Sequence, residues 1–178
     1  MEKLLKIPYN VFNDWNQLQQ FLERKGNPRY ELVGNVFLAN RKDISDLGNL
    51  VRVDGELILY RSSIQSLGNL EYVGINLDLR YTPIKSLGNL VRVDGYLWLD
   101  ESSIESLGNL EYVGGDFDLR WSSIQSLGNL EYVGKGLYLQ NTPIQSLGNL
   151  EYVGDIIYLS RNHQIPEEQL TKFKIKYV

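Results

Sequence analysis

The sequence predicts a mainly β protein, a parallel β-solenoid of about seven 20-residue coils, and three observations support this. The pentapeptide SLGNL recurs at residues 66, 86, 106, 126 and 146, with DLGNL at 46, so the period of 20 never slips. Six columns of the repeat stay apolar from coil to coil. Between them, segments such as Gly74 to Arg80 alternate polar and apolar residues, which is typical of half-buried strands.

The apolar columns identify the core. They are Leu47 to Leu147, Leu50 to Leu150, Val53 to Val153, Leu59 to Leu159, Ile64 to Ile144, and a sixth column of Leu57, Leu77, Leu97, Phe117, Leu137 and Ile157. A fully buried apolar side chain contributes roughly 1.5 to 3 kcal/mol. Stacked coils therefore form a continuous core, whereas a single coil would not fold alone.

Within a coil, residues such as Leu77 and Leu79 are expected to face the core. A coil of 20 residues has no room for a three-turn helix, so SLGNL and the TPI or SSI segments are predicted to form tight turns, a 3₁₀ turn or a short second strand. Asn49 to Asn149 form a column predicted to stack coil on coil and to bond neighbouring backbone groups. The glycines that precede the strands are predicted to adopt positive φ at a corner; they are Gly55, Gly74, Gly95, Gly114, Gly115, Gly134 and Gly154.

The two ends of the chain depart from the repeat. A degenerate first coil is expected to place Val33, Gly34, Phe37, Ala39 and Ile44 in the columns of the later coils. The sequence predicts an N-terminal helical cap over 1–29, the solenoid over 30–165, with the clear repeat over 46–165, and a C-terminal cap over 166–178, all as one structural unit.

Each predicted cap has its own signals. At the front, Asn13 and Asp14 are expected to begin a helix that carries Trp15, Leu18 and Leu22 on one face, with Gly26 and Pro28 as stop signals. At the back, Pro166, Glu167 and Glu168 are typical of the first turn of a helix, and Leu170 and Phe173 are expected to cover the last coil.

Composition argues against several classes of function. The chain of 178 residues has no cysteine, which excludes disulfides, thiolate nucleophiles and Cys-based zinc sites. A net charge of −4 disfavours nucleic acid and anionic membranes as partners. The opening MEKLLKIPYNVFNDW lacks the features of a secretory signal, and no apolar run is long enough to cross a membrane, so a cytoplasmic location is expected.

The pattern LxxLxxVxGxLxLxxTxIxS, seen from Leu67 to Ser86, resembles leucine-rich repeats over about two thirds of the chain. The stretch Asn109 to Leu119 also looks like the coils of receptor L domains, and such short coils are similar to those of bacterial and phage repeat proteins. The resemblance implies a right-handed solenoid of the leucine-rich-repeat type that serves as a ligand-binding scaffold, most often for proteins. Two departures leave a β-helix cross-section open: the coil is short, and Ser or Thr stands at 62, 82, 102, 122 and 142, where the consensus prefers Asn.

The outward strand positions diverge between coils, unlike the core columns, and they are enriched in Trp, Tyr and Arg, the residue types that dominate protein interfaces. We therefore expect a partner-binding face centred on Trp98, Asp100, Arg120, Trp121 and Tyr138. The full predicted set is Ile58, Tyr60, Arg61, Asp78, Arg80, Tyr81, Tyr96, Trp98, Asp100, Glu101, Asp118, Arg120, Trp121, Tyr138 and Tyr158.

Two structural interpretations compete with binding. Arg80, Asp100 and Arg120 would form an alternating charge ladder if the strands stack about 4.8 Å apart. A second column alternates or stacks guanidinium and aromatic groups on another face, which is explained by packing alone; it consists of Arg52, Tyr72, Arg92, Tyr112, Tyr132 and Tyr152.

An alternative function is carbohydrate binding or cleavage by a β-helix, with Asp78 and Asp118 as carboxylates and Trp98 stacked on a sugar. Arg80 and Arg120 beside them argue against a general acid. The single histidine, His163, has no His or Cys neighbour with which to share a metal and is expected to be a structural or surface residue. We expect no enzyme activity, no metal and no cofactor, and a protein partner bound by a monomer or homodimer that acts as an inhibitor or adaptor.

Overall fold

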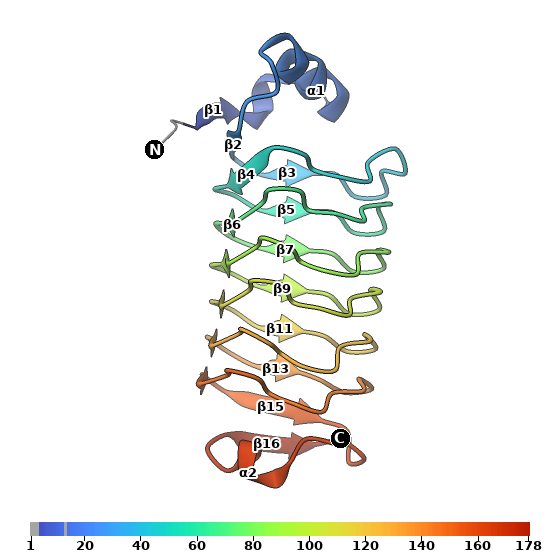
Figure 1. The fold of residues 1–178 in the computed structure, drawn as a ribbon, viewed down its shortest axis with the longest axis vertical. Coiled ribbons are helices and arrows are strands. Elements are labelled where there is room, and N and C mark those ends of the chain that lie inside the picture. The colour runs from blue at the N-terminus through green and yellow to red at the C-terminus, as the bar shows by residue number, and fades with distance from the viewer. Residues whose placement is uncertain (1–3, 13) are drawn as a thin grey trace.

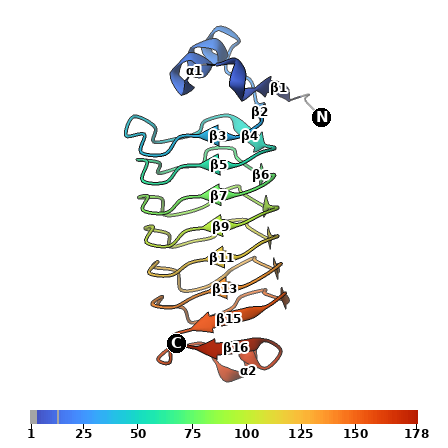
Figure 2. The same ribbon diagram turned by 180° about the vertical axis from the view of Figure 1, so that it is seen from behind.

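The computed structural model describes residues 4–12 and 14–178. Within them, the chain forms an elongated stack of coils in which two parallel sheets of eight strands run along the long axis (Figures 1 and 2). Every neighbouring pair of strands is parallel. This confirms the predicted parallel β-solenoid of about seven coils.

Each coil contributes one strand to each sheet. Sheet A has the order β1 (Leu5–Pro8), β2 (Tyr30–Val33), β4 (Leu50–Val53), β6 (Tyr72–Val73), β8 (Arg92–Val93), β10 (Tyr112–Val113), β12 (Tyr132–Val133) and β14 (Tyr152–Val153). Sheet B has the order β3 (Val36–Phe37), β5 (Leu57–Ile58), β7 (Leu77–Asp78), β9 (Leu97–Trp98), β11 (Phe117–Asp118), β13 (Leu137–Tyr138), β15 (Ile156–Leu159) and β16 (Lys174–Tyr177).

The core lies between the two sheets and the turns that close each coil. The six predicted apolar columns fill it, and only Val153, near the C-terminal end, is half-buried. Leu77 and Leu79 face inward as predicted, both with no exposed surface. In-register parallel pairing places each core residue directly against its counterpart one coil away, so a single 20-residue pattern is enough to build the whole interior.

The SLGNL segments form tight turns that lead into the strands of sheet A. Gly68 takes a φ of 58°, and the Ser66 hydroxyl accepts a hydrogen bond from its backbone N–H at 2.9 Å. The predicted role of the asparagine column is confirmed: Asn69 donates to the Asn49 side chain at 2.9 Å, and Asn89 donates to the Gly68 carbonyl at 3.2 Å.

The prediction of positive φ at the glycines before the sheet B strands is wrong. Positive φ belongs instead to the glycine of each SLGNL turn. The corner glycines are needed because the coils approach closely there: a Cβ on Gly114 would overlap the carbonyl oxygen of Asp94 in the preceding coil. Steric exclusion, not a left-handed backbone, therefore keeps a side chain out of these positions.

The first coil has a different register from the one predicted. In β2, Leu32 pairs with Val53 in place of the predicted Val33, and in β3 Val36 pairs with Leu57 and Phe37 with Ile58, so this coil is offset by one residue from β2 onward. Val36 and Leu38 consequently fill the core, whereas Phe37, expected in a core column, is 62% exposed on the outer face of sheet B. Because side chains alternate along a strand, a slip of one residue exchanges the buried and exposed sets.

Helix α1 (Trp15–Arg24) lies beyond the first coil (Figure 1) and buries Trp15, Leu18 and Leu22. The Asp14 carboxylate caps it by accepting from the Gln17 backbone N–H at 2.9 Å; Asn13, the other predicted cap residue, lies outside the described residues. A 3₁₀ turn (Tyr9–Val11) precedes the helix, and β1, which the sequence did not predict, pairs with β2.

At the other end, helix α2 (Glu167–Leu170) buries Leu170, and Phe173 packs half-buried against the core. The chain then adds β16 to sheet B, a strand that the repeat pattern did not predict because it has no SLGNL segment. None of the described helices is long and apolar enough to cross a membrane.

Candidate interaction face

The outward residues of sheet B bring most of the predicted site together. Successive coils place Ile58, Asp78, Trp98, Asp118, Tyr138 and Tyr158 in one column and Tyr60, Arg80, Asp100 and Arg120 in the next. Tyr96 precedes Trp98 in its coil. The remaining predicted residues, Arg61, Tyr81, Glu101 and Trp121, lie in the turns that follow the strands.

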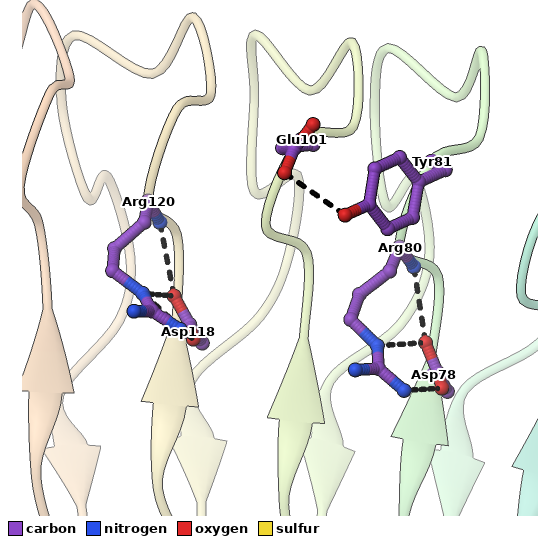
Figure 3. A network of polar contacts seen from close by, with 6 residues as sticks. All are labelled: Asp78, Arg80, Tyr81, Glu101, Asp118 and Arg120. Carbon is purple, nitrogen blue, oxygen red and sulfur yellow. Dashed lines mark hydrogen bonds and ion pairs between the residues drawn. The ribbon is translucent and has the colours of Figure 1, made fainter.

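Two ion pairs are built into this face (Figure 3). The Arg80 guanidinium donates to both oxygens of Asp78, at 2.9 and 2.6 Å, and the Arg80 backbone N–H donates to the same carboxylate at 3.1 Å. Arg120 and Asp118 repeat this arrangement two coils later, at 2.9 and 2.5 Å. Residues two apart on a strand share a face, which allows each arginine to fold back over its own aspartate.

This geometry corrects two expectations. The arginines pair within their own coils instead of forming an alternating ladder with Asp100. Asp78 and Asp118, predicted as accessible, have side chains only 5% and 9% exposed, because Arg80 and Arg120 cover them. A partner that approaches this face meets the arginines, which are 37% and 45% exposed.

Asp100 lies in the coil between the two ion pairs. Its pKa is raised, first by burial and then by the charge of Asp118, while Arg80 and Arg120 act in the opposite direction. The carboxyl group is half-buried, and both neighbouring guanidinium groups are already held by other carboxylates. The folded structure therefore disfavours the charged form of the Asp100 carboxyl group.

The aromatic residues of the face are packed and ordered. Tyr96 and Trp98 stack with ring centroids 5.5 Å apart, and the Arg80 guanidinium lies between Tyr60, at 5.3 Å, and Trp98, at 5.5 Å. Farther along, Tyr138 stacks on Tyr158 at 4.7 Å. Trp98, predicted as the centre of the face, is therefore half-buried among its neighbours and not freely exposed.

A ridge of turn residues borders the face. We call Arg61, Tyr81, Glu101, Trp121 and Asn141 the corner ridge; each follows a sheet B strand by a few residues, and all five are exposed. The Tyr81 hydroxyl donates to Glu101 at 2.9 Å, which raises the pKa of Tyr81 (Figure 3). Trp121 is 64% exposed, the most exposed aromatic side chain in the repeat region that the structure describes.

The backbone of the corner ridge is left-handed. The five residues have φ values of 54°, 57°, 55°, 60° and 58°, and Asn40 occupies the equivalent turn of the first coil with 63°. This conformation costs an L-residue other than glycine roughly 1 to 2 kcal/mol, least for asparagine, whose short polar side chain is tolerated there. Asn40 and Asn141 fit the turn, whereas Arg, Tyr, Glu and Trp do not, although the fold places them there.

Sequence reasoning missed Phe37, which extends the column of Ile58 at the N-terminal end of the face. The alternation within GNVFLAN, with Val36 and Leu38 on one side, was the signal that could have located it. The repeat alignment gave the opposite assignment because one residue is displaced within the first coil.

The residues considered for catalysis or metal binding are engaged in contacts within the chain. Asp78 and Asp118 are fully engaged by arginines, and Tyr96 and Arg80 already contact the Trp98 ring. His163 accepts a hydrogen bond from the Ile165 backbone N–H at 3.2 Å and stacks on Tyr177. No cluster of three or more potential His, Cys, Asp or Glu ligands occurs among residues 4–12 and 14–178.

A surface hollow of about 510 Å³ is lined by Glu105, Ser106, Gly108 and Gln125 among others. It contains none of the predicted site residues. Comparison of this chain with models of known protein families, with curated proteins and with solved structures finds no match.

Proposed function

We propose that this chain is a non-enzymatic binding protein in which the outward face of sheet B and the corner ridge together dock a macromolecular partner, most simply a protein. The observation that carries the proposal is the corner ridge, where Tyr81, Glu101 and Trp121 occupy left-handed backbone positions and project into solvent.

The coil requires a left-handed turn here, but it does not require large side chains in it, and residues held in such strained positions cluster at functional sites. A turn selected for stability alone would carry asparagine or glycine at each ridge position, as it does at Asn40 and Asn141. At Trp121, which is 64% exposed, the apolar surface that stays buried does little more than offset the cost of the left-handed backbone. A contact with another molecule supplies the missing reason for these large side chains.

The neighbouring face favours binding in a second way. Its Trp, Tyr and Arg side chains are fixed by stacking and by the two ion pairs, so little conformational entropy is lost when a partner covers them. This is typical of a preorganised protein interface. A small binder of this kind acts by occupying its target, as an inhibitor or an adaptor does.

The carbohydrate alternative rests on Trp98 between Asp78 and Asp118. It is less well supported, because the arginines cover both carboxylates and the Trp98 ring is already stacked. A partner that contacts Arg80, Arg120 and the corner ridge does not require the two carboxylates or the indole ring to be accessible.

Several finer features belong to the same proposal. We assign the coils to a right-handed solenoid of the leucine-rich-repeat type, and we assign α1 and the segment that contains α2 and β16 the role of caps. We expect a cytoplasmic monomer or homodimer. Deletion of residues 166–178 would expose Leu159 and the edge of β15, so the proposed cap predicts self-association of the truncated chain in size-exclusion chromatography.

The binding face is tested by affinity capture from a lysate of the source cells with three immobilised proteins: wild type, Trp121→Asn and Ile75→Asn. Ile75 is a matched control because it is an apolar residue, 45% exposed, outside the face. A protein retained by wild type and Ile75→Asn but lost from Trp121→Asn supports the proposal. Titration of that protein should then show an affinity loss of about 30-fold, the effect of removing a hot-spot tryptophan. Equal capture by all three would return the ridge to a structural role.

A further inference from the structure

The outer face of sheet A carries a second column of interest. Its outward residues run Lys6, Glu31, Arg52, Tyr72, Arg92, Tyr112, Tyr132 and Tyr152 from one end to the other. A neighbouring column, one residue earlier in each coil, holds Glu71, Glu111, Glu131 and Glu151. The two halves of this face differ in how these groups are paired.

In the N-terminal half, each glutamate or tyrosine of the two columns lies beside a lysine or arginine side chain of the same chain. Lys6 pairs with Glu31 at 3.3 Å, and Arg29 pairs with Glu71 at 2.7 Å. The Arg52 guanidinium lies 4.0 Å from the centre of the Tyr72 ring, and Arg92 lies 3.6 Å from that of Tyr112. The Glu71–Tyr72 unit therefore receives two arginines, one on the carboxylate and one on the ring.

In the C-terminal half, three consecutive coils repeat the same Glu–Tyr unit, and the sequence places no arginine in either column after Arg92. We call this region the Glu–Tyr strip; it consists of Glu111, Tyr112, Glu131, Tyr132, Glu151 and Tyr152. All three glutamates are exposed, and none forms an ion pair with any residue in the described part of the chain.

The strip is regular. Tyr112, Tyr132 and Tyr152 stack with centroids 4.6 and 4.8 Å apart and interplanar angles of 4° and 10°. The stack ends at Tyr152, which is 48% exposed and has Tyr132 on one ring face only. Backbone hydrogen bonds of 2.9 Å from Glu131 to Glu111 and from Glu151 to Glu131 hold the glutamates in register.

Three carboxylates directly above one another repel, and such in-register like charges destabilise a sheet. The N-terminal half shows what removes this repulsion, because there each Glu or Tyr accepts a guanidinium or ammonium group. Within the strip only Tyr112 receives such a group, from Arg92; the three glutamates, Tyr132 and Tyr152 have no cationic partner in the described part of the chain.

We propose that the Glu–Tyr strip binds an arginine-rich segment of a basic protein partner. The guanidinium groups pair with the glutamates as Arg29 pairs with Glu71, and one stacks on the C-terminal ring face of Tyr152, as Arg52 stacks on Tyr72 from the N-terminal side. Arginine fits better than lysine because its planar group both stacks on an aromatic ring and donates a fork of hydrogen bonds to a carboxylate. The surface lies on sheet A and does not depend on the sheet B face.

The test uses the full chain and two probes, a hexa-arginine and a hexalysine peptide of equal charge, titrated at low ionic strength and followed by calorimetry. Wild type should bind hexa-arginine more tightly than hexalysine. Glu111→Gln, Glu131→Gln and Glu151→Gln together should weaken hexa-arginine binding by about tenfold, since each exposed pair contributes a few-fold at most. Tyr152→Ala should reduce the preference for arginine over lysine.

The matched control replaces Glu23, Glu105 and Glu168, which are exposed and lie outside the strip, by glutamine. It has the same net charge and should retain most of the affinity. Equal losses in both triple variants would mean unspecific attraction to an acidic protein and would overturn the proposal, as would the absence of any preference for arginine. Wild type that dimerises in sedimentation, with a monomeric strip variant, would also overturn it, because a second copy would then be the occupant. A strip variant that fails to bind while its melting temperature holds or rises supports the proposal and excludes misfolding.

Discussion

The corner ridge makes a quantitative prediction for Trp121→Asn. Trp121 is 64% exposed, so about a third of its side chain is buried. For an aromatic side chain that buries at most roughly 250 Å², this is ~80 Å², or ~2 kcal/mol of apolar burial at ~25 cal/mol per Å². Asparagine loses this burial but relieves most of the roughly 1 to 2 kcal/mol that the left-handed backbone costs tryptophan. The free energy of unfolding should therefore change by no more than ~1 kcal/mol.

Urea denaturation followed by circular dichroism measures this change, and Leu97→Ala serves as the positive control. Leu97 has no exposed surface, so its truncation should cost about 2 to 5 kcal/mol. For a chain of this length, ~1 kcal/mol corresponds to about 2 to 4 °C in melting temperature. A loss of more than ~2 kcal/mol in Trp121→Asn would refute the reasoning, because it would show that the indole is a packing residue and that the ridge carries no relievable strain.

Three further predictions concern the sheet B face and the coil corners. Asp78→Asn should destabilise the fold by about 1 to 3 kcal/mol in urea denaturation, because it removes the charge that holds Arg80 over a buried position; the exposed Asp155→Asn should change little. Gly114→Ala should destabilise the chain more than Gly128→Ala, since a Cβ at 114 overlaps the Asp94 carbonyl, whereas Gly128 has open space and costs only the ~1 kcal/mol of its φ of 56°; equal effects in thermal melts would argue against the close coil contact. Asp100→Asn should stabilise the protein at neutral pH: the raised pKa of Asp100 means that the folded state binds its proton more tightly than the unfolded state, so this group lowers stability as pH rises from the unfolded pKa through the folded one. Stability curves of wild type and variant that stay parallel across the acidic range would contradict the last prediction.

Much of the fold was predictable because the repeat is a translational pattern. Apolar residues such as Leu57, Leu77 and Leu97 recur every 20 residues, each in a segment that alternates polar and apolar side chains. Only stacked coils bury all of them together. The same logic failed at the ends, where β1 and β16 lie outside the repeat, and at Phe37, where one displaced residue reverses inside and outside. A pattern indicates register only where it is unbroken.

The predicted site was a list of positions on one outward face; the structure places most of them on sheet B, and Arg61, Tyr81, Glu101 and Trp121 in the turns that follow its strands. The sequence did not separate Asp78, which is covered, from Trp121, which is bare, because both diverge between coils. Whether Arg80 would reach up to Asp100 or back to Asp78 depends on side-chain geometry that spacing alone leaves open. The left-handed backbone at Tyr81 and Trp121 could not be predicted either, because neither tyrosine nor tryptophan is typical of that conformation.

The sequence by itself determined the period, the core columns, the parallel stacking and the general position of the outward face, because these follow from where apolar residues recur and from the need to bury them. The tertiary structure decided which glycines face a neighbouring backbone, which charges pair, which side chains are strained and which glutamates of the Glu–Tyr strip have no cationic partner among the described residues. These depend on distances between coils and on the directions of individual side chains, which arise only when the coils are stacked.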